Sequence, residues 1–193
     1  MPNKLTHHIN DTQLEYILDE LGALKDYRMQ IICLLMPRGL RIQDTLNLTI
    51  EDIYDEDGSI LNNLFIKEGK TGKRKMVSLK GAKLGAALNL HWNSLKYSNP
   101  ESPIFTNNRG EQLTQYGVRY ILHKLFDGKK GIRKKDFACH SFRKYGARKM
   151  YLEGGKNAIV VSKILNHINT DVTYAYIDFQ PEEVRQATSV VDL

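Results

Sequence analysis

Residues 60–79, ILNNLFIKEGKTGKRKMVSL, decide the fold class of this 193-residue chain. The β-compatible residues from Ile60 to Lys67 predict a strand, and the glycine-containing segment 68–73 predicts the tip of a hairpin. The return strand, Arg74 to Leu79, alternates basic and apolar residues. We therefore predict that one antiparallel hairpin, or a small sheet built on it, is the β structure of the chain.

The segments on both sides of this hairpin have the apolar spacing of helices. Asn10 or Asp11 can cap a first helix, and the apolar stretch from Asp26 to Met36 predicts a second one that Pro37-Arg38-Gly39 ends. Further helices are predicted at 40–48, about 84–95, 114–127, 141–153, 158–166, 171–178 and, briefly, from Pro181. The predicted fold class is mainly α with a small antiparallel β-sheet (α+β).

Composition excludes several classes of protein. Hydrophobic residues make up 41% of the chain, which is enough to bury a core. The longest apolar run, Ile31 to Met36, is far shorter than the roughly 18 residues of a membrane span, and the N-terminus lacks the apolar core of a signal peptide. Two cysteines, Cys33 and Cys139, are too few for a disulfide scaffold. We therefore expect a cytoplasmic protein that does not bind membranes.

The net charge of +6 is concentrated in two short segments. Residues 1–66 carry 5 basic and 11 acidic side chains, whereas residues 67–83 carry 7 and 1, and residues 128–149 carry 9 and 1. Such segments are typical of a surface that binds a nucleic-acid backbone, although an anionic protein or lipid would fit the charge alone. The residues predicted to contact such a backbone are Lys73, Arg74, Lys75, Lys129, Lys130, Arg133, Lys134, Lys135 and Lys144.

Four segments carry polar groups that could support chemistry: residues 38–44, 69–73, 140–143 and 165–176. Taken singly, each has an ordinary explanation. Arg41 could pair with Asp44 on one helix, Lys70 could be a solvated hairpin lysine, and Tyr174 or Tyr176 could be a packing aromatic.

Two other kinds of site are excluded. Residues 69–71 read Gly-Lys-Thr, but position 64 holds leucine where a phosphate-binding P-loop needs glycine. His140 and His167 lie 27 residues apart without a convincing third ligand, so they do not predict a zinc site. We expect neither a metal nor a cofactor.

In this order and spacing, the four segments resemble the catalytic domain of the tyrosine recombinase (phage integrase) family. The likeness runs from about Thr6 to Phe179. The nucleophilic tyrosine of the family usually follows the last histidine by nine residues, which selects Tyr176 over Tyr174. The positions that match the family's other boxes are Gly39-Leu40-Arg41 with Asp44, Lys70, His140 to Arg143, and Leu165-Asn166-His167.

Several features depart from the family pattern. Asp44 stands where glutamate is commoner, Asn166 replaces the usual glycine, and Lys144 stands where many members have a second histidine. The first two replacements predict that the site residues are placed slightly less precisely than in the family, but no charged catalytic group is lost. Most members also carry an N-terminal domain that clamps the other side of the DNA. We expect residues 1–193 to be the catalytic domain alone, either an excised fragment or a short single-domain member.

The resemblance implies a site-specific recombinase that cleaves and rejoins DNA strands through a 3′-phosphotyrosyl intermediate, without metal or ATP. Tyr176 would attack the phosphodiester, with His140 as general base and Lys70 as general acid. Arg41, Arg143 and His167 would stabilise the phosphate, with Asp44 in support.

The expected partner is double-stranded DNA. We expect a monomer in solution that forms a homotetramer on DNA, with the tail 177–193 docking on a neighbouring subunit, and a gene carried by a bacterium, a phage or another mobile element. Two alternatives stay open: a type IB topoisomerase, which shares this chemistry, and a DNA-binding module without catalytic activity.

Overall fold

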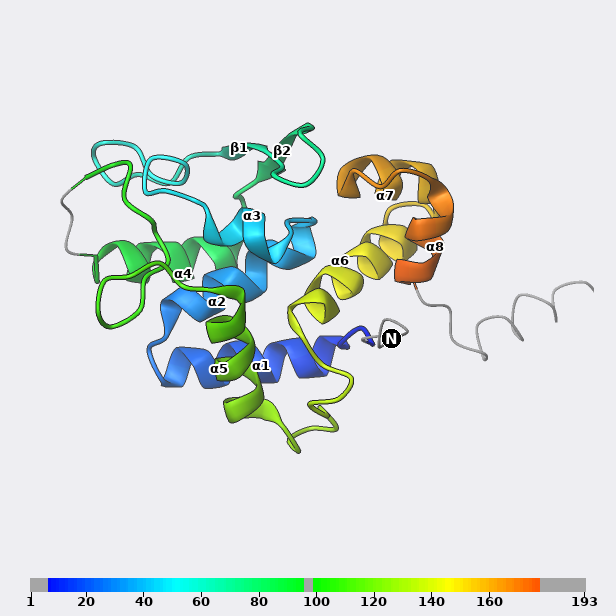
Figure 1. The fold of residues 1–193 in the computed structure, drawn as a ribbon, viewed down its shortest axis with the longest axis horizontal. Helices are drawn as coiled ribbons and strands as arrows, with labels where there is room; N and C mark the ends of the chain where they lie inside the picture. The colour runs from blue at the N-terminus through cyan, green and yellow to red at the C-terminus, as the bar shows by residue number, and fades with distance from the viewer. Residues whose placement is uncertain (1–6, 96–98, 178–193) are drawn as a thin grey trace, which may run out of the picture.

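The computed structural model describes residues 7–95 and 99–177. The predicted helix from Pro181 and nearly all of the tail 177–193 lie outside the described residues. The observed strands are β1 (Asn63–Lys67) and β2 (Arg74–Ser78). The observed helices are α1 (Asp11–Ala23), α2 (Tyr27–Leu35), the 3₁₀ helix η1 (Met36–Arg38), α3 (Ile42–Leu46), α4 (Ala82–Trp92), α5 (Gln115–Phe126), α6 (Cys139–Glu153), α7 (Ala158–Leu165) and α8 (Thr170–Ile177). The predicted fold class is confirmed (Figure 1).

Side chains cap the start of four of the described helices. Asn10 accepts a hydrogen bond from the Gln13 N–H at the start of α1, and Asp26, Thr114 and Asn157 cap α2, α5 and α7 in the same way. Each cap satisfies backbone N–H groups that the first helical turn leaves without partners. None of the helices in the described ranges is both long and apolar enough to cross a membrane.

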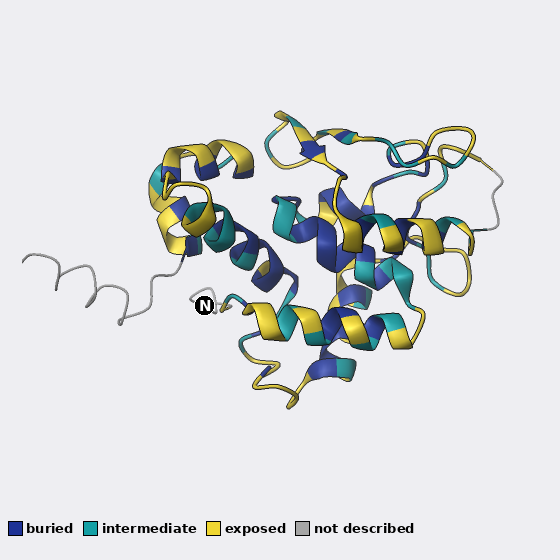
Figure 2. Ribbon diagram, turned by 180° about the vertical axis from the view of Figure 1, so that it is seen from behind, coloured by how far each residue is buried: buried dark blue, intermediate teal, exposed yellow. Residues whose placement is uncertain are grey.

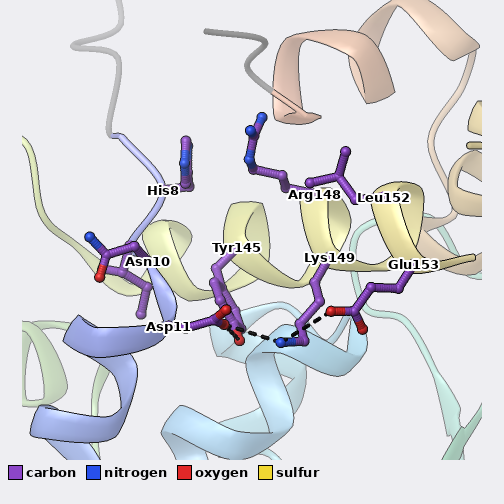
Figure 3. A pocket seen from close by; sticks show the side chains of 9 residues that line it. His8, Asn10, Asp11, Tyr145, Arg148, Lys149, Leu152 and Glu153 are labelled. Atoms are coloured by element: carbon purple, nitrogen blue, oxygen red, sulfur yellow. Dashed lines mark hydrogen bonds and ion pairs between the residues drawn. The ribbon is translucent and has the colours of Figure 1, made fainter. Parts of the chain in front are cut away.

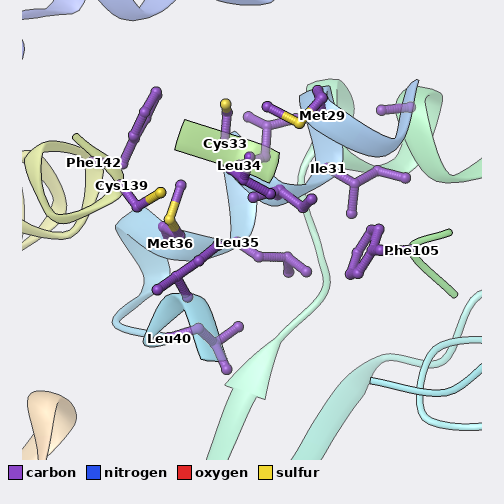
Figure 4. Packing of buried hydrophobic residues seen from close by; sticks show 14 of the residues in the cluster. Met29, Ile31, Cys33, Leu34, Leu35, Met36, Leu40, Phe105, Cys139 and Phe142 are labelled. Atoms are coloured by element: carbon purple, nitrogen blue, oxygen red, sulfur yellow. The ribbon is translucent and has the colours of Figure 1, made fainter. Parts of the chain in front are cut away.

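Helix α2 forms the centre of the hydrophobic core. It is apolar on nearly every side, and its residues from Ile31 to Leu35 are all buried. Figure 4 shows these side chains packing with Phe105 and with Phe142 of α6. Cys33 and Cys139 are buried free thiols in the same core. Exposed residues follow the outer faces of the surrounding helices (Figure 2).

The two strands form an antiparallel hairpin with a fixed register. Leu64 pairs with Val77, and Ile66 pairs with Lys75. Directly paired residues lie on the same face of a sheet, and alternate residues of one strand share that face. Leu64 and Val77 are buried, so Lys75 belongs to the inward face of the hairpin.

Helix α4 spans Ala82–Trp92 rather than about 84–95, and β1 begins at Asn63 rather than at Ile60. Helices α3 and α6 also begin or end at positions other than those predicted. Helix α3 covers only Ile42–Leu46 rather than 40–48, because Gly39 adopts a left-handed turn with a φ of 88° and Arg41 is extended. Helix α6 begins at Cys139 rather than at residue 141, because the Ser141 hydroxyl accepts a hydrogen bond from the Ala138 N–H at 3.2 Å. The differences in α3 and α6 bear on the site described below.

A close backbone contact fixes α6 against η1. Gly146 of α6 faces Pro37 so closely that a Cβ on this glycine would lie 1.8 Å from the Pro37 carbonyl oxygen. Only glycine allows two backbones to approach this far. Arg143 precedes Gly146 by three residues, so it lies on the same face of α6 and meets the turn that follows η1.

Candidate active site

The turn at Gly39 joins three elements of the fold. Its carbonyl oxygen accepts a hydrogen bond from Nη1 of Arg143, on α6, and another from Nζ of Lys75, on β2. Nη2 of Arg143 donates to the Leu165 carbonyl at the end of α7, at 2.7 Å. Arg143 is only 1% exposed, and these backbone carbonyls provide hydrogen bonds to both Nη atoms of the buried guanidinium. Its Nε has no hydrogen-bond partner among the described residues.

Tyr176 and two histidines lie next to this arginine. The hydroxyl of Tyr176 is within hydrogen-bond distance of Nε2 of His140, and the ring centroid of His167 lies 4.6 Å from that of Tyr176. Nδ1 of His167 is 2.9 Å from the hydroxyl oxygen of Thr173. Arg148 of α6 donates to the Ile177 carbonyl at 3.1 Å, which ties the end of α8, and with it Tyr176, to α6.

The charges in this cluster affect its titrating groups in a consistent way. Part of His140 is exposed, but desolvation and the charges of Arg143 and Lys144 lower its pKa to about 4. Desolvation, followed by the charges of Arg143 and Arg41, also lowers the pKa of His167 to about 4. Burial raises the pKa of Tyr176, although Arg143 acts in the opposite direction. Near neutral pH the cluster therefore pairs a protonated phenol with a neutral imidazole that can accept its proton.

Arg41 lies at the start of α3 between two carboxylates. Its Nη1 is 2.5 Å from Oε2 of Glu68 and 3.9 Å from Oδ2 of Asp44. Oδ1 of Asp44 accepts a hydrogen bond from the Gly69 N–H at 3.0 Å. Asp44 therefore joins α3 to the hairpin tip in addition to its contact with Arg41.

Glu68 is a site residue that the sequence analysis missed. Its side chain is fully buried, and its Oε2 accepts a hydrogen bond from the Thr71 hydroxyl at 2.7 Å. Burial raises the pKa of this carboxyl, but Thr71 and Arg41 outweigh that effect and hold the pKa below its ordinary value. The signal in the sequence was that Glu68 is the only acidic residue among the basic residues of 67–83.

Two lysines of the hairpin, Lys70 and Lys75, differ in their exposure. Lys70, the predicted general acid, is exposed at the hairpin tip, and it is near enough for its charge to contribute to the low pKa of His140. Lys75, predicted to contact the DNA backbone, is instead half-buried inside the hairpin.

Lys144 also differs from its prediction as a surface contact. It is only 5% exposed, because it lies on α6 close to the cluster, and its Nζ is 6.0 Å from the Tyr176 ring centroid. The other residues predicted to contact DNA are exposed: Lys73, Arg74, Lys129, Lys130, Arg133, Lys134 and Lys135.

The left-handed conformation at Asn166 corrects one expectation. Asn166 ends α7 with a φ of 53°, a conformation that glycine adopts most easily and that asparagine tolerates better than other residues. Asn166, in place of the family's glycine, therefore keeps the left-handed turn that leads into His167, and the backbone geometry at this turn is not disturbed.

A surface hollow between α1 and α6 contains none of the predicted site residues. It measures about 160 Å³ and includes Asp11, Tyr145 and Lys149 in its lining. Figure 3 shows the Lys149 ammonium between the carboxylates of Asp11 and Glu153, at 3.1 and 3.3 Å. These contacts hold the start of α1 on α6. Within 7–95 and 99–177, no three His, Cys, Asp or Glu side chains are grouped as metal ligands.

Comparisons with known proteins match this chain along nearly all of its length. A model of the phage integrase family matches residues 7–183. Tyrosine recombinase XerH of Campylobacter jejuni is 26% identical over 194 residues, which cover 97% of this chain and 52% of the relative. Tyrosine recombinase XerC of Leptospira interrogans is 29% identical over 185 residues, which cover 92% of this chain and 56% of the relative. The chain thus spans about half the length of these relatives.

Solved structures share the fold. The crystal structure of XerA recombinase has a TM-score of 0.75 at 21% identity, and the match covers 100% of this chain and 68% of that one. XerH bound to a palindromic difH substrate, in a post-cleavage complex, has a TM-score of 0.71 at 25% identity; the match covers 98% of this chain and 54% of that one.

Proposed function

Because the chain belongs to the phage integrase family, we propose that it is a site-specific recombinase that cleaves and rejoins double-stranded DNA through a 3′-phosphotyrosyl intermediate. One observation carries the proposal: the Tyr176 hydroxyl lies on Nε2 of a neutral His140, beside the buried guanidinium of Arg143. Such an arrangement joins a nucleophile, a base and a phosphate-binding cation.

In the proposed reaction, Tyr176 is the nucleophile and His140 is the general base. The phenol is protonated before attack, because its pKa is raised, so the imidazole must take the proton as the oxygen–phosphorus bond forms. The tyrosyl ester keeps the energy of the broken phosphodiester, which allows rejoining without ATP.

Arg41, Arg143 and His167 would donate hydrogen bonds to the non-bridging oxygens of the phosphate. A guanidinium carries its charge at every physiological pH and presents several donors in one plane. Two such groups supply the positive charge that the developing oxyanion needs, so the proposed chemistry requires no metal or cofactor. Asp44 supports Arg41, which is 3.9 Å away.

Lys70 would protonate the leaving 5′ oxygen. The exposed position of Lys70 at the hairpin tip suits a group that approaches the strand only when DNA is bound. The exposed basic residues of 67–83 and 128–149 would hold the flanking phosphates.

We further propose that residues 1–193 form the catalytic domain, that four copies assemble on the DNA, and that the chain works in the cytoplasm. Structures of related recombinases with bound DNA support the choice of partner; one is a lambda integrase dimer on a COC′ core site. We assign the tail 177–193 to contact with a neighbouring subunit.

The test is covalent trapping of the protein on a nicked, labelled DNA substrate, followed by a denaturing gel. Tyr176→Phe should abolish the adduct, because phenylalanine keeps the ring and loses only the attacking oxygen. Tyr174→Phe is the matched control, two residues away on the same helix and 46% exposed, and it should form the adduct at the wild-type rate. An adduct that persists in Tyr176→Phe, or that maps to Tyr174, would overturn the assignment.

A second measurement separates the proposed recombinase from a topoisomerase. Supercoiled DNA without a recombination site should be relaxed slowly or not at all. Rapid relaxation of such DNA by the wild-type chain would favour the type IB topoisomerase alternative.

A further inference from the structure

Lys75 projects inward from β2, unlike its neighbours on the hairpin. It shares a face with the buried Val77, and its partner across the hairpin is Ile66. The outward face carries the exposed pair Phe65 and Met76. Because side chains alternate along a strand, the register itself directs the Lys75 ammonium toward the protein interior.

The ammonium of Lys75 shares its acceptor with Arg143. Both side chains donate to the carbonyl oxygen of Gly39. Gly39 makes this approach possible, because a Cβ at that position would lie 2.8 Å from the Lys75 Nζ. One buried oxygen therefore has two charged donors, one from the hairpin and one from α6.

The surroundings leave Lys75 able to act as a donor. Burial and the charge of Arg143 lower its pKa to about 8, while Glu68 and Asp44 act in the opposite direction. Most Lys75 side chains are therefore protonated at neutral pH.

Two backbone carbonyls hold Arg143 in the position from which it would turn toward the phosphate in the proposed reaction. Both of its Nη atoms donate to backbone carbonyls, those of Gly39 and Leu165. If Nη1 turns to a phosphate oxygen, the Gly39 carbonyl loses one donor. A buried carbonyl without any donor is costly, but here Lys75 would remain on it.

We propose that Lys75 is a positioning residue for DNA cleavage, which keeps the Gly39 carbonyl hydrogen-bonded when Arg143 turns to the scissile phosphate. This inference rests on the proposed function. It assigns Lys75 a role in placing Arg143 on the phosphate. This role differs from that of Lys70, which would protonate the leaving group.

The experiment measures single-turnover adduct formation at saturating DNA. Lys75→Met keeps an unbranched side chain of nearly the same length but removes its donor. It should slow the step by about tenfold to a hundredfold, as expected for an unsatisfied buried carbonyl. Lys75→Arg can still donate to Gly39 and should keep most of the wild-type rate. Lys124→Met replaces an exposed lysine of α5 that lies outside the proposed DNA-binding segments. It is the matched control and should react at the wild-type rate.

Two further readouts exclude other roles for Lys75. A lysine on the DNA backbone adds about one to the salt dependence of binding, so Lys73→Met should reduce that slope by about one and Lys75→Met should leave it unchanged. A substrate with sulfur in place of the leaving 5′ oxygen needs little protonation, so it should rescue Lys70→Ala and leave Lys75→Met slow.

Three results would overturn the inference: a wild-type rate in Lys75→Met, a Lys75→Arg variant as slow as Lys75→Met, or rescue of Lys75→Met by the sulfur substrate. If Lys75→Met does not fold, as its unfolding midpoint would show, the Lys75→Arg rate decides alone. Failure of the wild-type chain to form any adduct would instead refute the proposed function.

Discussion

Replacing Gly146 by alanine should both destabilise the protein and slow the proposed reaction. The new Cβ would lie 1.8 Å from the Pro37 carbonyl oxygen and 2.5 Å from the Pro37 Cα. Carbon atoms do not approach a backbone this closely, so α6 would have to move away from η1 by about an ångström or more. Such overpacking costs about 1–3 kcal/mol, and contact with rigid backbone places this site at the upper end of that range.

Helix propensity acts in the opposite direction, since alanine is favoured over glycine inside a helix by about 1 kcal/mol. The net destabilisation should therefore be about 2 kcal/mol. For a chain of this length, that corresponds to a decrease of roughly 4–8 °C in the unfolding midpoint. The movement of α6 would also pull Arg143 away from the Gly39 carbonyl, so adduct formation should slow in the same variant.

Gly85→Ala is the matched control. Gly85 also lies within a helix, α4, but a Cβ there would meet nothing within 4 Å. This variant should be more stable than the wild type by up to about 1 kcal/mol and should form the adduct at the wild-type rate. Thermal unfolding and adduct kinetics measured on both variants complete the comparison. A Gly146→Ala protein as stable as the wild type would refute the steric argument, and a destabilised one with an unchanged rate would show that this contact does not position Arg143.

Two further predictions concern His140 and the turn before His167. The pKa of His140 is lowered from 6.5 to about 4, so between these pH values the unfolded chain binds a proton more readily than the folded chain does. The unfolding midpoint should therefore decrease as the pH is lowered from about 6.5 to about 4. His140→Gln should make this decrease smaller, and an equal decrease in the variant would contradict the pKa shift. Asn166 has a φ of 53°, so Asn166→Ala should lower the free energy of unfolding, measured in urea, by about 1 kcal/mol, while Asn166→Gly should lower it little. Equal losses of stability in the two variants would argue against the left-handed turn.

Local signals in the sequence were sufficient for most of the fold. A capping residue, Asn10 or Asp11, followed by apolar spacing predicted the first helix, and the structure confirms it with Asn10 as the cap. The hairpin was predictable because residues 68–73 combine glycines with polar residues between two β-compatible runs. The start of α3 was not, because it depends on the left-handed Gly39 and the extended Arg41, and neither conformation has a periodic signal.

The candidate site was predictable to the extent that it follows fixed spacings. The nine-residue spacing from His167 selected Tyr176, and the structure brings that hydroxyl to His140; the role of the tyrosine stays a prediction. The sequence analysis missed Glu68 and did not predict that Lys75 faces inward, because composition shows how many charges a segment has and not which way they face. Strand register decides the direction of Lys75, and only the folded hairpin brings Glu68 to Arg41.

The arrangement around Gly39 also indicates what DNA would have to change. In the structure, the two Nη atoms of Arg143 donate to backbone carbonyls, and the guanidinium of Arg41 contacts the buried carboxylate of Glu68. These groups hold the arginines in place before a phosphate arrives, which reduces the reorganisation that catalysis would otherwise require. The same contacts compete with the phosphate, because each donor turned to DNA leaves a buried acceptor behind. Lys75 resolves this conflict at Gly39, and Thr71, which donates to Oε2 of Glu68, can reduce it at Arg41. If the scissile phosphate binds as proposed, it would exchange hydrogen-bond partners within a preformed site, and the side chains that stay on Gly39 and Glu68 would decide how much that exchange costs.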